Sequence, residues 1–282
     1  MAKVNKDKEK EKKIFGASHS KMATYRRCRQ QFHWKYINKY FPPSSMGQAR
    51  GTAGHAALAT WHVSYTEDLA TKAAWENWSN AGFGDNQDWQ QLYQALLRYY
   101  VWSKQHDTFV LKVAEQKFDI EYEVEGIPAM FNGFIDGIVE DSGKLWLLEN
   151  KFYKRMDNSS LDMDQQVSLY LLAAHLLKYD VQGVIYNMVR VGDTKIAVTE
   201  PVVRRKIYRS SAGLSKIQDE MLTQVREMMI YELKGGAPYR NPTKDCSWDC
   251  SFYAACISMT DDGIEPTDFL KTLSEVRSND NG

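Results

Sequence analysis

The sequence is short of cysteine and proline and carries no net charge. Its 282 residues include 4 cysteines and 7 prolines, and 36 basic residues balance 36 acidic ones. In a cytosolic chain, four cysteines favour metal ligands, cluster ligands or plain core thiols over disulfides. The balanced charge excludes a protein that binds nucleic acid through its overall charge, so any such site must be a local groove.

Long hydrophobic runs are absent too. No apolar stretch approaches the ~20 residues of a membrane span, and Met1–Lys13 is too polar for a signal peptide. We therefore expect a soluble, cytoplasmic protein with no membrane partner. Because 43% of the residues are hydrophobic and 26% are charged, wholesale disorder is excluded as well.

The hydrophobic period changes along the chain and predicts a mixed α/β fold with an antiparallel meander in its middle. Helices are expected from Ser18 or Ser20 through Trp34, at 48–65, over most of 66–112 with a break at 82–86, at 164–179 and at 211–233. Strands are expected at 118–124, 129–139, 144–152, 184–191 and 197–203, with turns at Glu125-Gly126 and Asp141-Ser142-Gly143. We expect a flexible basic tail at 1–17, one folded domain at 18–260 with 66–112 as a helical insertion, and a C-terminal tail at 261–282.

The meander carries the residues most suited to chemistry. Asp136 lies near the end of one expected strand, and Glu149-Asn150-Lys151 lies in the next. A period of two places Glu149 and Lys151 on one face, and a hairpin brings Asp136 beside them. Paired carboxylates suit Mg²⁺ or Mn²⁺, and a neighbouring lysine could orient water or neutralise charge at a phosphodiester. Acids and a lysine are common on surface hairpins, but here the apolar neighbours predict a buried strand. Charged side chains are rare on a buried strand because burying them is costly, so their presence calls for an explanation.

Asp136 and Glu149-Asn150-Lys151, together with two further motifs described below, resemble the PD-(D/E)XK nuclease superfamily, in particular its RecB-like branch with the CRISPR-associated RecB-type exonucleases. Asp136 and Glu149-Asn150-Lys151 are similar to the catalytic motif, although Ile135 replaces its proline. The resemblance implies a restriction-endonuclease-like core with a central mixed sheet flanked by helices.

Two further motifs extend this resemblance. Gly51-x-x-x-His55 is similar to a helix motif whose histidine is a metal ligand, and Gln166-x-x-x-Tyr170 is similar to a motif that steadies the lysine and contacts DNA. The resemblance implies that His55, Asp136, Glu149 and the Asn150 carbonyl bind the metal. It also implies that Lys151 assists the attacking water. Glu115 occupies the place of an acidic residue often seen before the meander.

The cysteines form a split set of one early and three late residues. Cys28 lies in the first expected helix, and Cys246, Cys250 and Cys256 form C-x3-C-x5-C near the end. This arrangement resembles that of RecB-like nucleases with an iron–sulfur cluster, which implies a [4Fe–4S] cluster bound by the four thiolates in a lobe formed by 28 and 246–256. Arg29 and the C-x3-C spacing depart from that pattern. Tetrahedral zinc and unligated thiols are the alternatives.

Local basic clusters offer DNA contacts. The candidates are Arg26, Arg27, Lys154 and Arg155, with a further cluster at 204–209. Aromatic residues beside basic ones suit stacking on single-stranded bases, but ordinary solvated faces explain such clusters equally well.

The combined prediction is a Mg²⁺- or Mn²⁺-dependent DNA exonuclease that acts on DNA ends or single strands and leaves 5′-phosphate and 3′-hydroxyl products. It would serve recombination, repair, replication or CRISPR adaptation, as a homo-oligomer or with partner proteins of those pathways. A phage homologue, placed in the host cytoplasm, is among the alternatives. The other alternative functions are a non-catalytic DNA-end-binding recombination module, stabilised by an iron–sulfur cluster or by zinc, and a zinc-stabilised binding protein.

Overall fold

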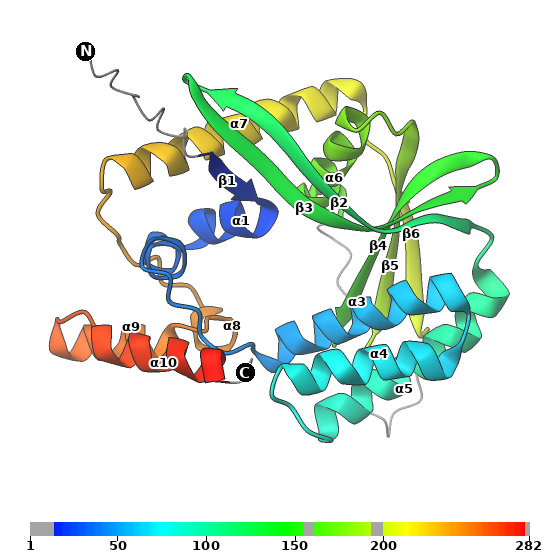
Figure 1. Cartoon of the computed structure of the whole chain (residues 1–282), viewed down its shortest axis with the longest axis horizontal. Coiled ribbons are helices and arrows are strands. Elements are labelled where there is room, and N and C mark those ends of the chain that lie inside the picture. Colours follow the sequence, from blue (N-terminus) through cyan, green and yellow to red (C-terminus); the bar gives the residue numbers. More distant parts are fainter. Residues whose placement is uncertain (1–13, 155–160, 193–199, 280–282) are drawn as a thin grey trace, which may run out of the picture.

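The structure is a computed structural model that describes residues 14–154, 161–192 and 200–279. These residues include a six-stranded mixed sheet with the order β1-β3-β4-β5-β6, in which β2 also pairs with β3 (Figure 1). The strands are β1 (Phe15–Ser18), β2 (Val110–Val124), β3 (Ile127–Asp141), β4 (Lys144–Tyr153), β5 (Val181–Arg190) and β6 (Val202–Ile207). β1 runs parallel to β3 and β4 runs parallel to β5, whereas the other pairs are antiparallel.

The central meander follows from two tight turns. Glu125 and Gly126, and likewise Ser142 and Gly143, adopt positive φ, as two-residue hairpins between right-twisted strands require. Both turns lie where the sequence predicts them. β2, however, begins at Val110 inside the segment expected to be helical. The early part of β2 carries helix-forming Lys, Ala, Glu and Gln residues, and pairing with β3 overrides that preference.

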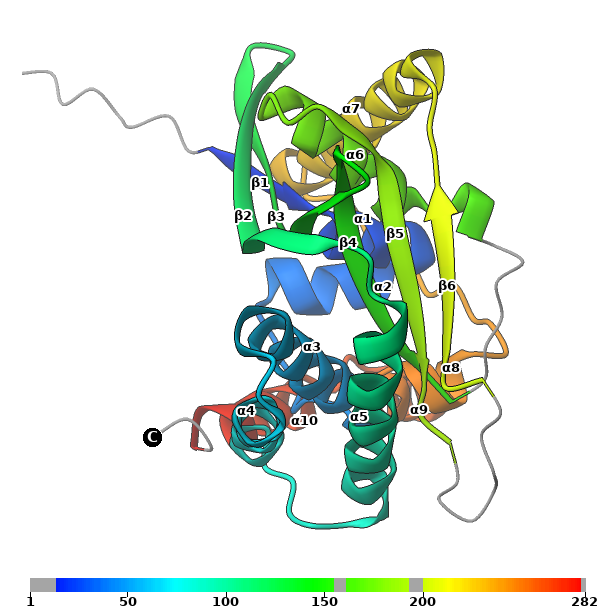
Figure 2. The same ribbon diagram turned by 90° about the vertical axis from the view of Figure 1, so that its right-hand side faces the viewer.

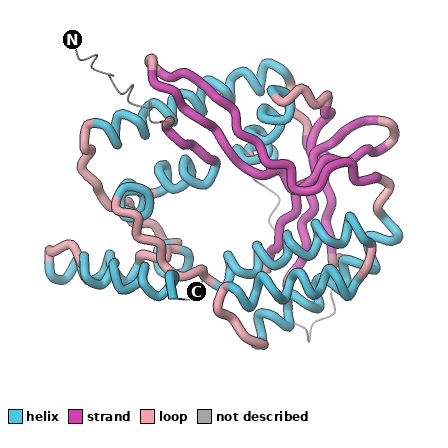
Figure 3. The backbone as a smooth tube through the Cα atoms, viewed as in Figure 1, coloured by secondary structure: helices cyan, strands magenta, loops and turns pink. Residues whose placement is uncertain are grey.

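Two groups of helices flank the sheet (Figures 1 and 2). α1 (His19–Arg27), α6 (Gln165–Leu176) and α7 (Ser211–Leu233) share one hydrophobic core with strand residues such as Phe131 and Leu147. α3 (Met46–Ser64), α4 (Glu67–Asn80) and α5 (Gln87–His106) form a second core, in which Trp61 stacks on Tyr100 with ring centroids 4.6 Å apart. The tube in Figure 3 shows the strands gathered between these helices. The fold is therefore the restriction-endonuclease-like α/β class that the sequence predicts.

The N-terminal segment is not the continuous helix expected from Ser18 to Trp34. α1 is capped by the Ser18 hydroxyl, which accepts a hydrogen bond from the Lys21 N–H over 3.2 Å, and it ends at Cys28. Cys28 is extended, with φ −161° and ψ 122°, and α2 (Arg29–Phe32) and a π-helical turn (His33–Ile37) follow. Phe15–Ser18, expected at the end of the flexible tail, pair with β3, and 1–13 lie outside the described residues.

The C-terminal segment differs from the expected tail at 261–282. After α8 (Cys246–Asp249) and α9 (Tyr253–Asp262), residues Thr267–Asn279 form α10. Leu270 of α10 is fully buried against Trp34 and Phe252, and the Trp34 indole N–H donates to Glu265 Oε1 over 2.6 Å. β6 also lies later than the strand expected at 197–203, of which 197–199 are not described. None of the helices in the described parts of the chain is long and apolar enough to cross a membrane.

Candidate active site

The register of β3 and β4 brings the predicted acids together. Gly137 pairs with Leu148, so the same register places Asp136 beside Glu149 one step further along. The backbone N–H of Asn150 donates to Asp136 Oδ2 over 2.8 Å. β5 pairs in parallel with β4 on its other side, so this part of β4 is buried in the sheet, and Glu149 is only 3% exposed.

The Asp136 carboxylate is held through one of its oxygens. Oδ2 receives the Asn150 backbone N–H, the Asn150 side-chain Nδ2 at 3.3 Å and His55 Nδ1 at 3.0 Å. Burial by itself raises the pKa of Asp136, but the contacts with His55 and the Asn150 N–H outweigh it, and the net shift is downward. Burial likewise lowers the pKa of His55, yet the neighbouring Asp136 reverses the shift and raises it. Asp136 therefore stays ionised beside a histidine that favours its protonated form.

Glu149, Lys151 and Gln166 form a closed polar triangle. Lys151 Nζ lies 2.5 Å from Glu149 Oε1 and donates to Gln166 Oε1 over 3.0 Å. The Gln166 Nε2 donates back to Glu149 Oε1 over 3.1 Å. Asp164 caps α6 by accepting the Gln166 N–H over 2.8 Å, which fixes the first turn that carries Gln166. Gln166 thus holds both charged groups of the motif in one geometry.

Burial and charge shift the titration of this triangle. Burial, reinforced by Asp136, raises the pKa of Glu149 to about 7. Burial alone lowers the pKa of Lys151, but Glu149 and Asp136 outweigh it and raise it overall. Burial also raises the pKa of Tyr170 to about 12, while its ring lies edge-on to Phe118 at 5.7 Å between centroids. Lys151 is consequently a fixed cation near neutral pH and is poorly suited to act as a base.

The donor set fits a hard divalent cation. Glu149 Oε2 is buried and has no hydrogen-bond partner among the described residues, and a buried acceptor without a donor calls for an explanation. Carboxylate oxygens with one imidazole suit Mg²⁺ or Mn²⁺. His55 and Asp136 already touch, but within the described ranges no three His, Cys, Asp or Glu side chains are grouped closely enough to hold one metal ion. Binding would therefore require some of these side chains to reorient.

Glu115 lies at the edge of the same site. With His55, Asp136 and Asn150 it lines a small hollow between α3 and the meander. Its φ is +48°, a left-handed conformation that costs about 1–3 kcal/mol for a residue other than glycine. Such strain is concentrated at functional sites, but the Glu115 side chain is exposed, and its correspondence to the acidic residue often seen before the meander stays a prediction.

A glycine of α3 positions His55 against the sheet. A Cβ built on Gly54 would lie 2.4 Å from the Phe152 ring of β4, whereas one on Gly51 meets nothing within 4 Å. The motif quoted from the sequence contains Gly51, but Gly54 is the residue that the close approach of α3 and β4 requires. We expect Gly54→Ala to lower the free energy of unfolding by about 1–3 kcal/mol, because it overpacks this contact. Gly51→Ala, in the same helix, should raise it by about 0.5–1 kcal/mol. Urea denaturation measures both, and equal effects would contradict the packing role of Gly54.

All four cysteines line one cavity of about 130 Å³, although Cys28 is more than two hundred residues from the others in sequence. Each is a free thiol. Cys28, extended between α1 and α2, thus lies at the same cavity as the three cysteines of the C-terminal lobe, but in the described part of the chain no three of these thiols are grouped closely enough to hold one metal ion. Burial, with neighbouring thiols as a further cause, raises the pKa of Cys256 to about 11.

The predicted DNA-binding cations are partly engaged with acids. Arg27 lies 2.7 Å from Asp249 Oδ2 in α8, and Lys154 Nζ lies 2.7 Å from Asp88 Oδ1. The Arg26 guanidinium donates to the Gln224 side chain. Arg155 lies outside the described residues. These contacts leave the DNA-binding roles as predictions.

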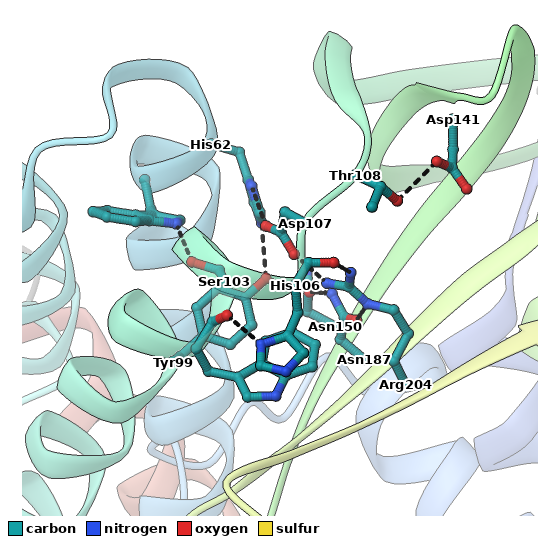
Figure 4. A network of polar contacts seen from close by, with 12 residues as sticks. His62, Tyr99, Ser103, His106, Asp107, Thr108, Asp141, Asn150, Asn187 and Arg204 are labelled. Atoms are coloured by element: carbon teal, nitrogen blue, oxygen red, sulfur yellow. Dashed lines mark hydrogen bonds and ion pairs between the residues drawn. The ribbon is translucent and has the colours of Figure 1, made fainter.

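Sequence reasoning missed two groups near the site. Phe134, two residues before Asp136 on β3, is 59% exposed and lines a hollow with Gln166 and Tyr170. Behind the site, a buried polar network extends from Asn150 to Arg204 (Figure 4). Phe134 could have been noted from the sequence, as an aromatic residue in an expected strand. Asn150, Asn187 and Arg204 are single polar residues on separate strands, and such residues form no sequence motif.

An acid on one strand, an acid and a lysine on the next and a glutamine on the following helix define a class of metal-dependent nucleases with an α/β fold. The chain belongs to the PD-(D/E)XK nuclease superfamily, whose family model matches residues 16–257. Membership implies DNA as the substrate, and these enzymes typically use a divalent cation such as Mg²⁺ or Mn²⁺.

Similar solved structures are remote in sequence. A protein from Eubacterium rectale described as "Putative exonuclease" is 12% identical, with 89% of this chain and 92% of that chain covered and a TM-score of 0.46. The crystal structure of SSO0001 is also 12% identical, with 88% and 89% covered and a TM-score of 0.40. No match was found among curated proteins. The assignment therefore depends on the family model and not on these neighbours.

Proposed function

We propose that the protein is a Mg²⁺- or Mn²⁺-dependent DNA exonuclease that acts on DNA ends or single strands. The observation that carries the proposal is the buried triangle of Glu149, Lys151 and Gln166 beside Asp136. A buried acid–lysine pair costs desolvation energy that an apolar pair would avoid, so its presence favours a chemical role. We further propose a cytoplasmic location and a role in DNA recombination, repair, replication or CRISPR adaptation.

Each residue of the site has a separate role in the reaction. Asp136, Glu149, His55 and the Asn150 carbonyl would hold the cation, which when bound supplies Lewis-acid polarisation of the phosphodiester. Water attacks the phosphorus and gives up a proton, the bond between the phosphorus and the 3′ oxygen breaks, and the leaving 3′ oxygen takes up a proton, which leaves 5′-phosphate and 3′-hydroxyl ends. Lys151 remains protonated and stabilises the negative charge that develops on the phosphate. Gln166 keeps the ammonium group directed at that position.

The surface beside the triangle is suited to a DNA strand. A hollow of about 550 Å³ is lined by Phe134, Gln166, Tyr170 and His19. An exposed aromatic ring offers a stacking platform for an unpaired base, and stacking is tolerant of sequence. This supports action on single strands or frayed ends.

We also propose that Cys28, Cys246, Cys250 and Cys256 bind a [4Fe–4S] cluster. Four thiols that line one cavity supply the soft ligands that such a cluster takes. Tetrahedral zinc uses the same ligands, so the metal content decides between them. Either metal would join α1 to the C-terminal lobe.

The function is tested with end-labelled single- and double-stranded DNA in the presence of Mg²⁺, Mn²⁺ or EDTA. We expect degradation from the ends with either metal and none with EDTA. DNA binding without cleavage under all conditions would instead support the non-catalytic end-binding module. Cleavage of closed circular DNA alone would contradict exonuclease action.

A further inference from the structure

A chain of hydrogen bonds leads from the Asp136 carboxylate into the sheet. Asn150 donates to Asp136 Oδ2, and its own Oδ1 accepts from Asn187 Nδ2 over 3.0 Å. Asn187 Oδ1 in turn accepts from Arg204 Nε over 2.7 Å. Arg204 Nη2 lies 2.6 Å from Asp107 Oδ1 at the end of α5 (Figure 4). β3, β4, β5 and β6 each contribute one member, and Asp107 follows the last residue of α5.

Most of this chain is deeply buried, although the Asp136 and Arg204 side chains are 19% and 17% exposed. Asn187 is 0% exposed and Asn150 is 3% exposed, and the Asp107 side chain is 5% exposed. The Arg204 guanidinium also lies 4.7 Å from the centre of the Trp102 ring, which limits its movement. In such surroundings each hydrogen bond is stronger than in water, and a polar group left without a partner destabilises the fold.

Arg204 sets the direction of the whole chain. A guanidinium has donors and no acceptor, so the Asn187 oxygen must face Arg204 and its amide nitrogen must face Asn150. Asn150 must then turn its oxygen to Asn187 and its nitrogen to Asp136. A flip of either amide would oppose two donors or two acceptors.

The direction of this hydrogen-bond chain determines how the Asp136 carboxylate is held. Three donors, two from Asn150 and one from His55, converge on Oδ2, and within the described residues no hydrogen bond engages Oδ1. The carboxylate is therefore fixed in rotation, with Oδ1 as the oxygen left to a cation.

We propose that Arg204 and Asn187 are positioning residues, which orient Asp136 for metal binding through Asn150. The proposal rests on the proposed function, because it requires a cation at Asp136. It also assigns Asp107 of the helical insertion as the anchor that holds Arg204. Asn187 Nδ2 also lies 3.4 Å from the Tyr99 hydroxyl, and His62 Nε2 lies 3.0 Å from the same hydroxyl, so His62 of α3 is joined to the network.

The sharpest test is Asn187→Asp, which has the same shape and keeps an acceptor for Arg204. It removes the donor to Asn150, so the Asn150 amide must flip and present its oxygen to Asp136. We expect Mn²⁺ affinity, measured by electron paramagnetic resonance without DNA, to fall about 10- to 100-fold. A pure charge effect would have the opposite sign, because an added carboxylate attracts cations. We call the hydrogen-bond chain from Asp136 to Asp107 the relay. Mn²⁺ binding by Asn187→Asp that is equal to or tighter than that of the wild type would overturn the relay.

A control and a second variant complete the experiment. Lys206→Met breaks the other ion pair of β6, between Lys206 and Asp141 at 2.6 Å, without touching the relay, and should leave Mn²⁺ affinity unchanged. If Asn187→Asp does not fold, Asn187→Leu removes both polar atoms without adding charge and should also weaken binding. Asp136→Ala defines the background. Wild-type protein that binds no Mn²⁺ above this background overturns the metal site itself, whereas normal wild-type binding with unaffected Asn187 variants overturns only the relay.

Discussion

Lys151→Met should reduce the rate of DNA cleavage by about 100- to 1,000-fold, the effect of removing one group that stabilises transition-state charge. The substituted side chain keeps the length of the lysine stem but carries no charge to the phosphate. Glu149 loses its closest partner, so its pKa, already raised to about 7 by burial, should rise further and leave it protonated and neutral in the folded protein. Cleavage of end-labelled DNA at saturating Mg²⁺ measures the loss, and DNA affinity should change little.

A matched control lies three residues along the chain. Lys154 is 48% exposed and pairs with Asp88 at 2.7 Å, so Lys154→Met removes a lysine from the same segment without entering the triangle. It is a candidate DNA contact and should act on the apparent affinity for DNA and not on the rate at saturation. Near-normal cleavage by Lys151→Met at saturating metal would remove the lysine from the mechanism.

Protein purified without oxygen should be brown and contain about four irons per chain, as a [4Fe–4S] cluster requires. Cys28→Ser should abolish the cluster and lower the melting temperature by about 10 °C. A link between Cys28 and the late cysteines closes a very long loop, and a cross-link of that span contributes about 5 kcal/mol. Iron analysis, visible absorption and thermal unfolding measure the two effects.

Ser251→Ala is the matched control, because Ser251 is exposed and follows Cys250 directly. It should retain iron, colour and melting temperature. Anaerobic protein that contains stoichiometric zinc and no iron would contradict the cluster and favour the zinc alternative. Protein with neither metal would leave four ordinary thiols.

The parts of the fold that follow local rules could be predicted from the sequence. α7 begins at Ser211 and ends at Leu233, as its spacing and the Ser210 cap indicate, and β4 differs from its prediction by one residue. The same local rules bring Asp136, Glu149 and Lys151 together, because strand period and hairpin register are enough. Gln166 could be placed only through the resemblance, since its contact with Lys151 joins two separate elements.

Features that depend on distant contacts could not be predicted. The break of α1 at Cys28 has no proline or glycine to announce it, and the early part of β2 carries helix-forming residues. Arg204 belongs to a basic cluster in sequence and was a candidate for a solvated or DNA-binding face. Its partner Asp107 lies 97 residues earlier, so only the folded chain reveals a buried ion pair.

The packing of α10 on Trp34 sets a limit on how the chain can be shortened. A truncation after residue 260 would follow the domain boundary expected from the sequence, yet it would remove Glu265, which accepts the Trp34 indole N–H, and Leu270, which covers its ring. Trp34 and Phe252 would then face water on the lobe that carries the cysteines. A shortened protein would expose an aromatic surface that promotes aggregation. Its loss of metal or its aggregation could then be mistaken for a failure of the cysteines to bind the metal.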